Sequence, residues 1–108
     1  MGRPVCRLTD QAACPPHCHY CPVGAHAVIG PAIMGSPSVM VDGLPVLRET
    51  DMGLHAACCG PNIWLGDEGS GSVFADGLAV MRLGDPTMHC GSFEGAMVTS
   101  GSTVFVGD

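Results

Sequence analysis

A pattern of nine residues occurs three times in the chain and constrains its fold more than any other feature. Residues 43–51 and 77–85 share Gly, Leu, Val, Arg and Asp in the same places, at an offset of 34 residues. Residues 2–10 form a third copy that keeps the Gly, Val, Arg and Asp. Repetition of this kind predicts three equivalent units that bury their apolar faces against one another.

Each unit is predicted to be a β-hairpin. Asp42-Gly43 separates the apolar run 39–41 from the returning segment 46–48, and Asp76-Gly77 has the same setting in the next copy. Asp-Gly favours a two-residue hairpin turn, because a type I′ turn needs positive φ at both central residues.

The third hairpin is predicted to combine the two ends of the chain. Residues 100–108 resemble the segments that precede the other two turns, with a register left open by one residue. The run 104–106 would then pair with residues 4–6. Three hairpins around a pseudo-threefold axis also leave few sheet edges open.

Composition agrees with one all-β domain over residues 1–108. Hydrophobic residues make up 46% of the chain and charged residues 13%, which is too apolar for a disordered protein. Gly and Pro interrupt almost every possible helix. A net charge of −6 with only four Lys and Arg argues against nucleic acid and against an anionic membrane surface as partners.

The sequence also bears on localisation. No apolar run is long enough for a transmembrane helix, and the N-terminus lacks the apolar segment of a signal peptide. We therefore expect a protein that is made in the cytoplasm and exported, if at all, by another route.

Potential metal ligands follow each repeat. Cys14, His55 and His89 each stand four residues after the repeat Asp, so a pseudo-threefold body would bring them together at its narrow end. His26 can supply a fourth ligand. Four N and S ligands form a closed, tetrahedral zinc site of the structural kind, and such a site stabilises a small domain.

Other cysteines leave the fourth ligand open. The alternatives to Cys14 are Cys18, Cys21, Cys59 and Cys90. Cys18 and Cys21 form a C-x-x-C pair, but neither a second such pair nor the helical setting of a redox motif is visible. The mixed His and Cys set favours zinc over iron. A thiol-rich metal-binding or redox protein is the alternative function, whereas a metal-dependent hydrolase would need an open coordination position.

The remaining motifs are predicted to be structural. Each repeat carries one Arg and one Asp that we expect to form an ion pair: Arg7 with Asp10, Arg48 with Asp51, and Arg82 with Asp85. Gly43 and Gly77 are turn glycines and not part of a phosphate-binding loop. Trp64 is expected either to pack in the core or to anchor a partner.

These residues together resemble the PAAR-repeat family. The pattern Gly-Ser-x-x-Val…Asp-Gly-x-Pro-x-x-Arg-x-x-Asp, with His and Cys between its copies, extends over nearly the whole chain. The family's Pro-Ala-Ala-Arg appears at residues 4–7, 45–48 and 79–82 with larger apolar residues in place of alanine, so local packing must differ. The resemblance implies a small cone whose tip is held by one zinc ion with three His and one Cys. His26, His55 and His89 match those histidines, and Cys14 fits by its place in the repeat.

The resemblance also implies a structural part and not an enzyme. Members of the family sit on the trimeric β-helical spike (VgrG type) of type VI secretion systems and related contractile injection machines. One copy would cap one spike trimer, and its sharp point would meet the target membrane transiently during puncture. Residues 1–108 would form a bare tip without a toxin domain, with any effectors carried elsewhere on the spike.

Overall fold

A computed structural model describes residues 2–17, 26–55, 63–89, 93–100 and 102–107. These ranges contain strands and turns and no helix, which confirms the predicted all-β class. Among them there is accordingly no helix that could cross a membrane. The molecule is elongated, with extents of 40 × 26 × 22 Å.

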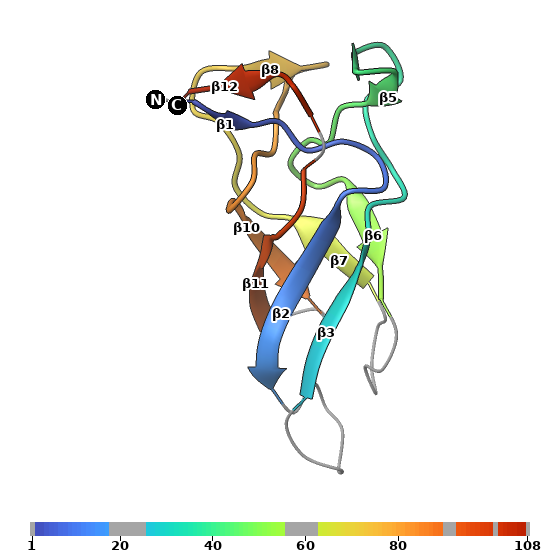
Figure 1. Cartoon of the computed structure of the whole chain (residues 1–108), viewed down its shortest axis with the longest axis vertical. Coiled ribbons are helices and arrows are strands. Elements are labelled where there is room, and N and C mark those ends of the chain that lie inside the picture. The colour runs from blue at the N-terminus through green and yellow to red at the C-terminus, as the bar shows by residue number, and fades with distance from the viewer. Residues whose placement is uncertain (1, 18–25, 56–62, 90–92, 101, 108) are drawn as a thin grey trace.

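Three short antiparallel pairs, here called the base hairpins, lie at one end of the molecule (Figure 1). They are β1 (Arg3–Pro4) with β12 (Phe105–Val106), β4 (Met40–Val41) with β5 (Leu44–Pro45), and β8 (Phe74–Ala75) with β9 (Leu78–Ala79). The pairing of β1 with β12 confirms that the two ends complete the third hairpin. The predicted type I′ turns are present as well, with φ of 52° at Asp42 and Asp76 and of 83° and 80° at the glycines that follow.

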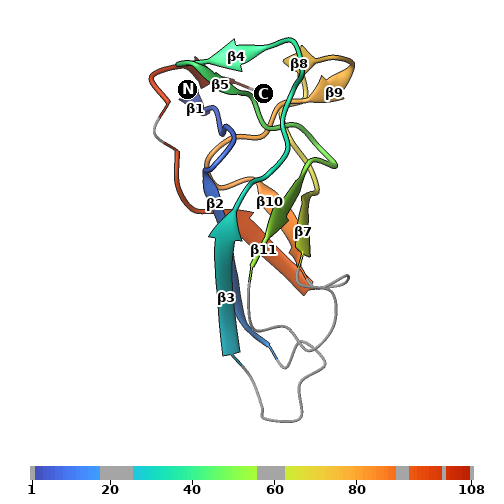
Figure 2. The same cartoon turned by 90° about the vertical axis from the view of Figure 1, so that its right-hand side faces the viewer.

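A six-stranded antiparallel sheet, here called the wall, extends from the base hairpins along the long axis (Figure 2). In spatial order its strands are β3 (His26–Pro31), β2 (Gln11–His17), β11 (Phe93–Met97), β10 (Pro86–His89), β7 (Ile63–Gly66) and β6 (Met52–Leu54). The edge strands β3 and β6 meet, because Ala32 bridges Gly53 and the amide of Ile33 donates to the carbonyl of Met52 at 2.9 Å. The wall is therefore nearly closed.

Three backbone hydrogen bonds form a cycle between the repeats. The amide of Cys6 donates to the carbonyl of Met81, that of Met81 to Leu47, and that of Leu47 to Cys6, each at 2.9 Å. The three residues occupy the same place in the three copies. The cycle therefore lies on the pseudo-threefold axis that the repeat predicted.

The return strand of each hairpin is shorter than predicted. We expected residues 46–48 to pair back within their own hairpin, but of these only Val46 does so, through its amide and the carbonyl of Val39 at 3.0 Å. Val46 also bridges Arg7 of a neighbouring repeat. Beyond it the chain pairs only with other repeats, since the amide of Leu47 donates to the carbonyl of Cys6 and Arg48 bridges Val80. The local apolar pattern is compatible with pairing within one hairpin and with pairing between repeats. The packing of the three repeats around the axis selects the second.

The predicted Arg–Asp ion pairs are present in all three repeats. The Nε–Oδ2 distances are 3.5 Å for Arg7–Asp10, 2.8 Å for Arg48–Asp51 and 2.9 Å for Arg82–Asp85. The same carboxylates accept the backbone amide of their arginine partners at 2.8–2.9 Å. Each Asp therefore closes the turn that joins the base to the wall, which is a structural role.

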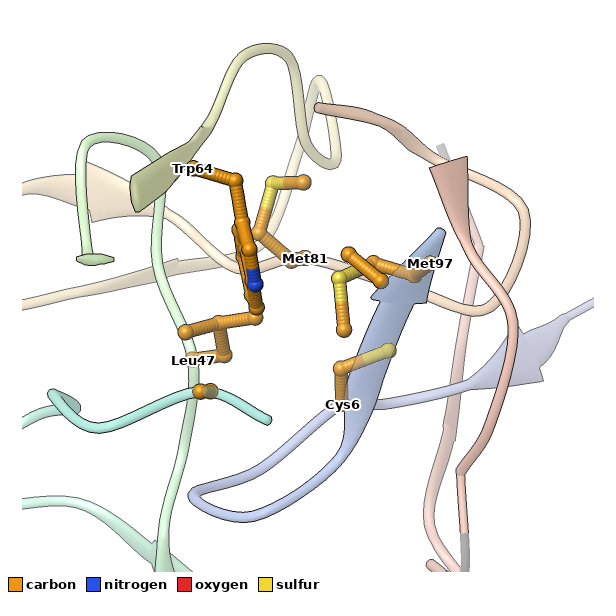
Figure 3. Close-up of a cluster of buried hydrophobic side chains, with 7 residues drawn as sticks. Cys6, Leu47, Trp64, Met81 and Met97 are labelled. Carbon is orange, nitrogen blue, oxygen red and sulfur yellow. The ribbon is translucent and has the colours of Figure 1, made fainter. Parts of the chain in front are cut away.

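The core lies where the base meets the wall. Cys6, Leu47, Trp64, Met81 and Met97 are fully buried there and pack together (Figure 3). The indole Nε1 of Trp64 donates to the carbonyl of Gly30 at 3.2 Å. Gly53 makes room for the ring, since a Cβ there would lie 2.0 Å from it. Trp64 is thus a packing residue in this structure.

The larger residues that replace the family's alanines fill two layers of this interior. Cys6, Leu47 and Met81 belong to the layer that contains Trp64. Val5, Val46 and Val80 form a second cluster beneath the base hairpins. Each layer therefore takes one equivalent residue from every repeat.

The third copy contains one extra residue, which explains its open register. The amide of Val46 bonds to the carbonyl of Val39 at 3.0 Å, and that of Val5 bonds to Val104 at 2.9 Å. Two residues separate Val39 from Ser36, whereas three separate Val104 from Ser100. The added residue is accommodated at Thr103, whose amide donates to the Asp42 carboxylate at 2.7 Å.

Thr50 is predicted to hold strain in the turn that joins base to wall. Its φ is 71°, and the equivalent position in the third turn is Gly84, with φ of 87°. A β-branched residue is disfavoured at positive φ, so we expect Thr50→Gly to stabilise the protein by about 1 kcal/mol in urea unfolding. Thr50→Ala keeps the Cβ and is expected to give a smaller gain. A Gly variant no more stable than the Ala variant would contradict the idea.

Candidate functional site

Three of the predicted ligands face the interior of the wall. The exposed fractions are 1% for Cys14, 6% for His55 and 0% for His89. Side chains alternate between the two faces of a strand, and each ligand stands two residues after another buried position. The repeat therefore places these three equivalent residues on the inner face of the wall.

His55 and His89 lie side by side. Their ring centroids are 5.2 Å apart with an interplanar angle of 17°, and the indole of Trp64 stacks on His89 at 6.0 Å. The hydroxyl of Thr87 lies 2.7 Å from Nε2 of His89 and helps to fix the orientation of the ring. Two imidazoles in a buried, partly aromatic setting supply nitrogen ligands of the kind that zinc takes.

The backbone opposite His89 leaves room for its ring. A Cβ added at Gly95 would lie 2.7 Å from Nε2 of His89 and 2.2 Å from the carbonyl oxygen of Ala13. A side chain at this position would therefore displace the ring or the strand. Sequence reasoning had not marked Gly95, and no motif distinguishes it from the other glycines.

Cys14 has a different environment. Its Sγ contacts the carbonyl oxygen of Glu94 at 3.5 Å, and burial raises the pKa of its thiol. It also lines an open pocket of about 600 Å³ between β2, β3 and β11, whose other lining residues are Ala13, Ala27, Glu94, Gly95, Ala96 and Val98. This lining is mostly apolar and does not gather the acid, base and nucleophile of a catalytic site.

The metal site stays a prediction. Among the side chains that the structure describes, no three His, Cys, Asp or Glu lie close enough to hold an ion. His26 begins β3 and pairs through its backbone with His17, but its side chain is outside the described part. The alternative ligands Cys18, Cys21, Cys59 and Cys90 lie outside the described residues as well.

The base hairpins carry a second candidate surface, which sequence reasoning missed. Met40, Phe74 and Phe105 occupy the same place in β4, β8 and β12, and their exposed fractions are 56%, 58% and 59%. The residues that follow them, Val41, Ala75 and Val106, face the opposite way and join the cluster beneath the base. Successive side chains of a strand point to opposite faces, so an all-apolar strand with one face open to solvent exposes every second residue, and this apolar run was present in the sequence.

Polar contacts fix the base hairpins to one another. The amide and hydroxyl of Thr103 donate to Asp42 and hold the pKa of that carboxyl below its usual range. The hydroxyls of Ser36 and Ser38 do the same for Asp76. Each of these contacts joins the turn of one hairpin to the segment before another. The three exposed apolar side chains therefore sit on a connected frame.

The chain matches a known family model. A model described as the PAAR motif matches residues 1–61 and, in an overlapping match, residues 28–95. The two matches together include all three Arg–Asp turns and both Asp-Gly turns. No curated protein matches the chain.

The hydroxyl of Thr87 is predicted to matter more than its methyl group. Thr87 is fully buried, so Thr87→Val keeps the shape of the side chain but removes the contact with His89. We expect this change to cost about 1 kcal/mol of unfolding free energy. Thr87→Ser keeps the hydroxyl and serves as the matched control, with the order of stability read from urea unfolding. Equal stability of the Val variant and the native protein would contradict this role.

Proposed function

Because the chain belongs to the PAAR-motif family of structural spike components of type VI secretion and related contractile injection systems, we propose that it caps the trimeric β-helical spike of VgrG type. The observation that carries this proposal is the set Met40, Phe74 and Phe105. These residues give one large exposed apolar side chain to each base hairpin around the pseudo-threefold axis. A threefold partner offers three equal sites, and one copy of this chain can meet all three at once.

The chemistry of the base suits such a partner. The three side chains are more than half exposed, and removal of apolar surface from water is the main driving force for association. The contacts of Asp42 and Asp76 hold the hairpins before binding, so little conformational entropy remains to be lost. The complex would contain one copy of the tip for each spike trimer.

The interior is proposed to hold one structural zinc ion. His55 and His89 would bind it with His26 and one cysteine, either Cys14 or one of its alternatives. Bound zinc would link strands from different repeats at the narrow end and so stiffen the point. Four protein ligands leave no position for a substrate, which fits a structural protein and not an enzyme.

The redox alternative finds no support from the two cysteines whose side chains are described. A reactive cysteine needs a lowered pKa and access to solvent. Cys6 and Cys14 are both buried, and burial raises the pKa of both thiols. We therefore propose that the protein acts mechanically. It would be assembled on the spike in the cytoplasm and exported with it, point first, through the target membrane.

Binding to the spike is predicted to depend on the base hairpins. We expect Met40→Thr, Phe74→Thr and Phe105→Thr, combined in one protein, to weaken its complex with the purified spike trimer by at least tenfold, because about 0.8 kcal/mol is lost for each CH₂ no longer buried. Titration followed by size-exclusion chromatography measures both affinity and stoichiometry. A matched variant, Ile29→Thr with Leu54→Thr and Leu65→Thr, changes the wall instead and should bind normally. A stoichiometry above one tip per trimer would contradict the proposal.

Metal content is predicted to be one zinc per chain in protein purified without chelators. His55→Ala and His89→Ala should each lose the ion and lower the melting temperature, because the ligands join different repeats. His19→Ala removes a histidine that the repeat does not place as a ligand, and it should keep the metal. Elemental analysis with thermal unfolding measures both effects. Absence of zinc from the native protein, or several ions unaffected by His55→Ala, would count against the site.

A further inference from the structure

The wall is almost uncharged. Within its six strands, as the structure describes them, Glu94 is the only charged residue. The arginines and their partners lie instead at the level of the base and of the turns that join it to the wall, as in the pairs Arg48–Asp51 and Arg3–Asp85. The described strands of the wall therefore contribute little to the net charge of −6.

The outward positions of the wall carry large aliphatic side chains. The exposed fractions are 55% for Ile29 in β3, 44% for Leu54 in β6 and 38% for Leu65 in β7. Ile33 and Met34 follow β3, are each 43% exposed, and bond through their amides to the carbonyl of Met52. The apolar surface thus continues from β3 across the closure of the wall onto β6 and β7.

We propose that this outer face of the wall is a lipid-contacting surface that favours the hydrocarbon of a membrane. The proposal rests on the proposed function for the event that brings the wall to a membrane, namely the advance of the spike. Once the wall is in the membrane, contact with lipid lowers the free energy of the protein, because aliphatic surface leaves water for acyl chains. Acyl chains would therefore contact the wall directly, without a layer of water between them.

The lack of polar groups favours lipid over a protein partner. Protein interfaces form about one hydrogen bond per 100–200 Å² and have a polar rim. Of the outward side chains of the wall strands that the structure describes, Gln11 and Glu94 are the main polar ones. The backbone of these strands is largely paired with neighbouring strands, which is the condition for polar groups to enter an apolar phase.

The lipid is predicted to be uncharged. Anionic headgroups would repel a chain of net charge −6, so binding should come from apolar contact alone. Partition into phosphatidylcholine vesicles should therefore hardly change with salt. Partition into vesicles that contain phosphatidylglycerol should be weaker and should rise as salt screens the repulsion.

Vesicle flotation of the full chain tests the proposal with two matched variants. The wall variant combines Ile29→Thr, Leu54→Thr and Leu65→Thr, since threonine is β-branched and suited to a strand. The base variant combines Met40→Thr, Phe74→Thr and Phe105→Thr, which remove three more exposed side chains. We expect the wall variant to partition into phosphatidylcholine at least tenfold less than the native protein, and the base variant to lose much less.

The outcomes separate this inference from the proposed function. Loss of spike binding in the base variant, with vesicle partition kept, supports both. If the native protein does not bind the spike trimer, the proposed function fails, and the vesicle experiment alone then decides whether the wall contacts lipid. Absence of flotation, or a loss as large in the base variant as in the wall variant, would overturn it. Self-association in solution that the wall variant abolishes would overturn it too, in favour of a second copy as the occupant. The fluorescence of buried Trp64 checks that each variant is folded.

Discussion

The cycle of hydrogen bonds between Cys6, Leu47 and Met81 is the constraint on which the structure depends. Each of these residues donates to one neighbouring repeat and accepts from the other, so no repeat can satisfy its buried backbone alone. A second cycle joins Leu8 to Pro45, Glu49 to Ala79 and Leu83 to Pro4 at 2.8–2.9 Å. The crossing of the three segments at the axis thus fixes where every hairpin and every wall strand begins.

The three copies are alike in the base hairpins and differ in the interior of the wall. On the base, Met40, Phe74 and Phe105 differ in side chain but hardly in exposure. Inside the wall the copies differ, because the buried ring of Trp64, the single tryptophan of the chain, is contributed by one of them. Its ring requires the bare backbone of Gly53, so this asymmetry is built into the neighbouring strand as well. The base therefore keeps the threefold symmetry of the repeat, whereas the interior of the wall does not.

Sequence predicted the parts of the fold that depend on local pattern. Asp42-Gly43 specifies its turn through backbone conformation alone, and Arg48 with Asp51 lies within one turn, so both predictions were confirmed. The return strand was predicted too long by Leu47 and Arg48, because tertiary packing decides between pairing within a hairpin and pairing across repeats. The family assignment was confirmed, since the repeated pattern is long and specific.

The candidate site was predicted less completely. The offset from the repeat Asp placed Cys14, His55 and His89 on the inner face, because offset and strand alternation together determine direction. The fourth ligand stays a prediction, because the alternative cysteines lie outside the described residues. The sequence identified the apolar residues of the base and wall but did not show which of them are exposed. Their exposure became evident only with the pairing, which shows which side of each short strand is covered.

The pairing of Arg3 with Val106 has a consequence for how the protein folds. These partners are separated by almost the whole chain, so the relative contact order is high and closure is entropically costly. The ring of hairpins cannot be completed until the last strand has been synthesised. Folding should therefore be slow and highly cooperative, and no fragment of one or two repeats would be a stable intermediate. A domain closed in this way is expected to be either completely folded or unfolded, which would suit the mechanical role proposed for it.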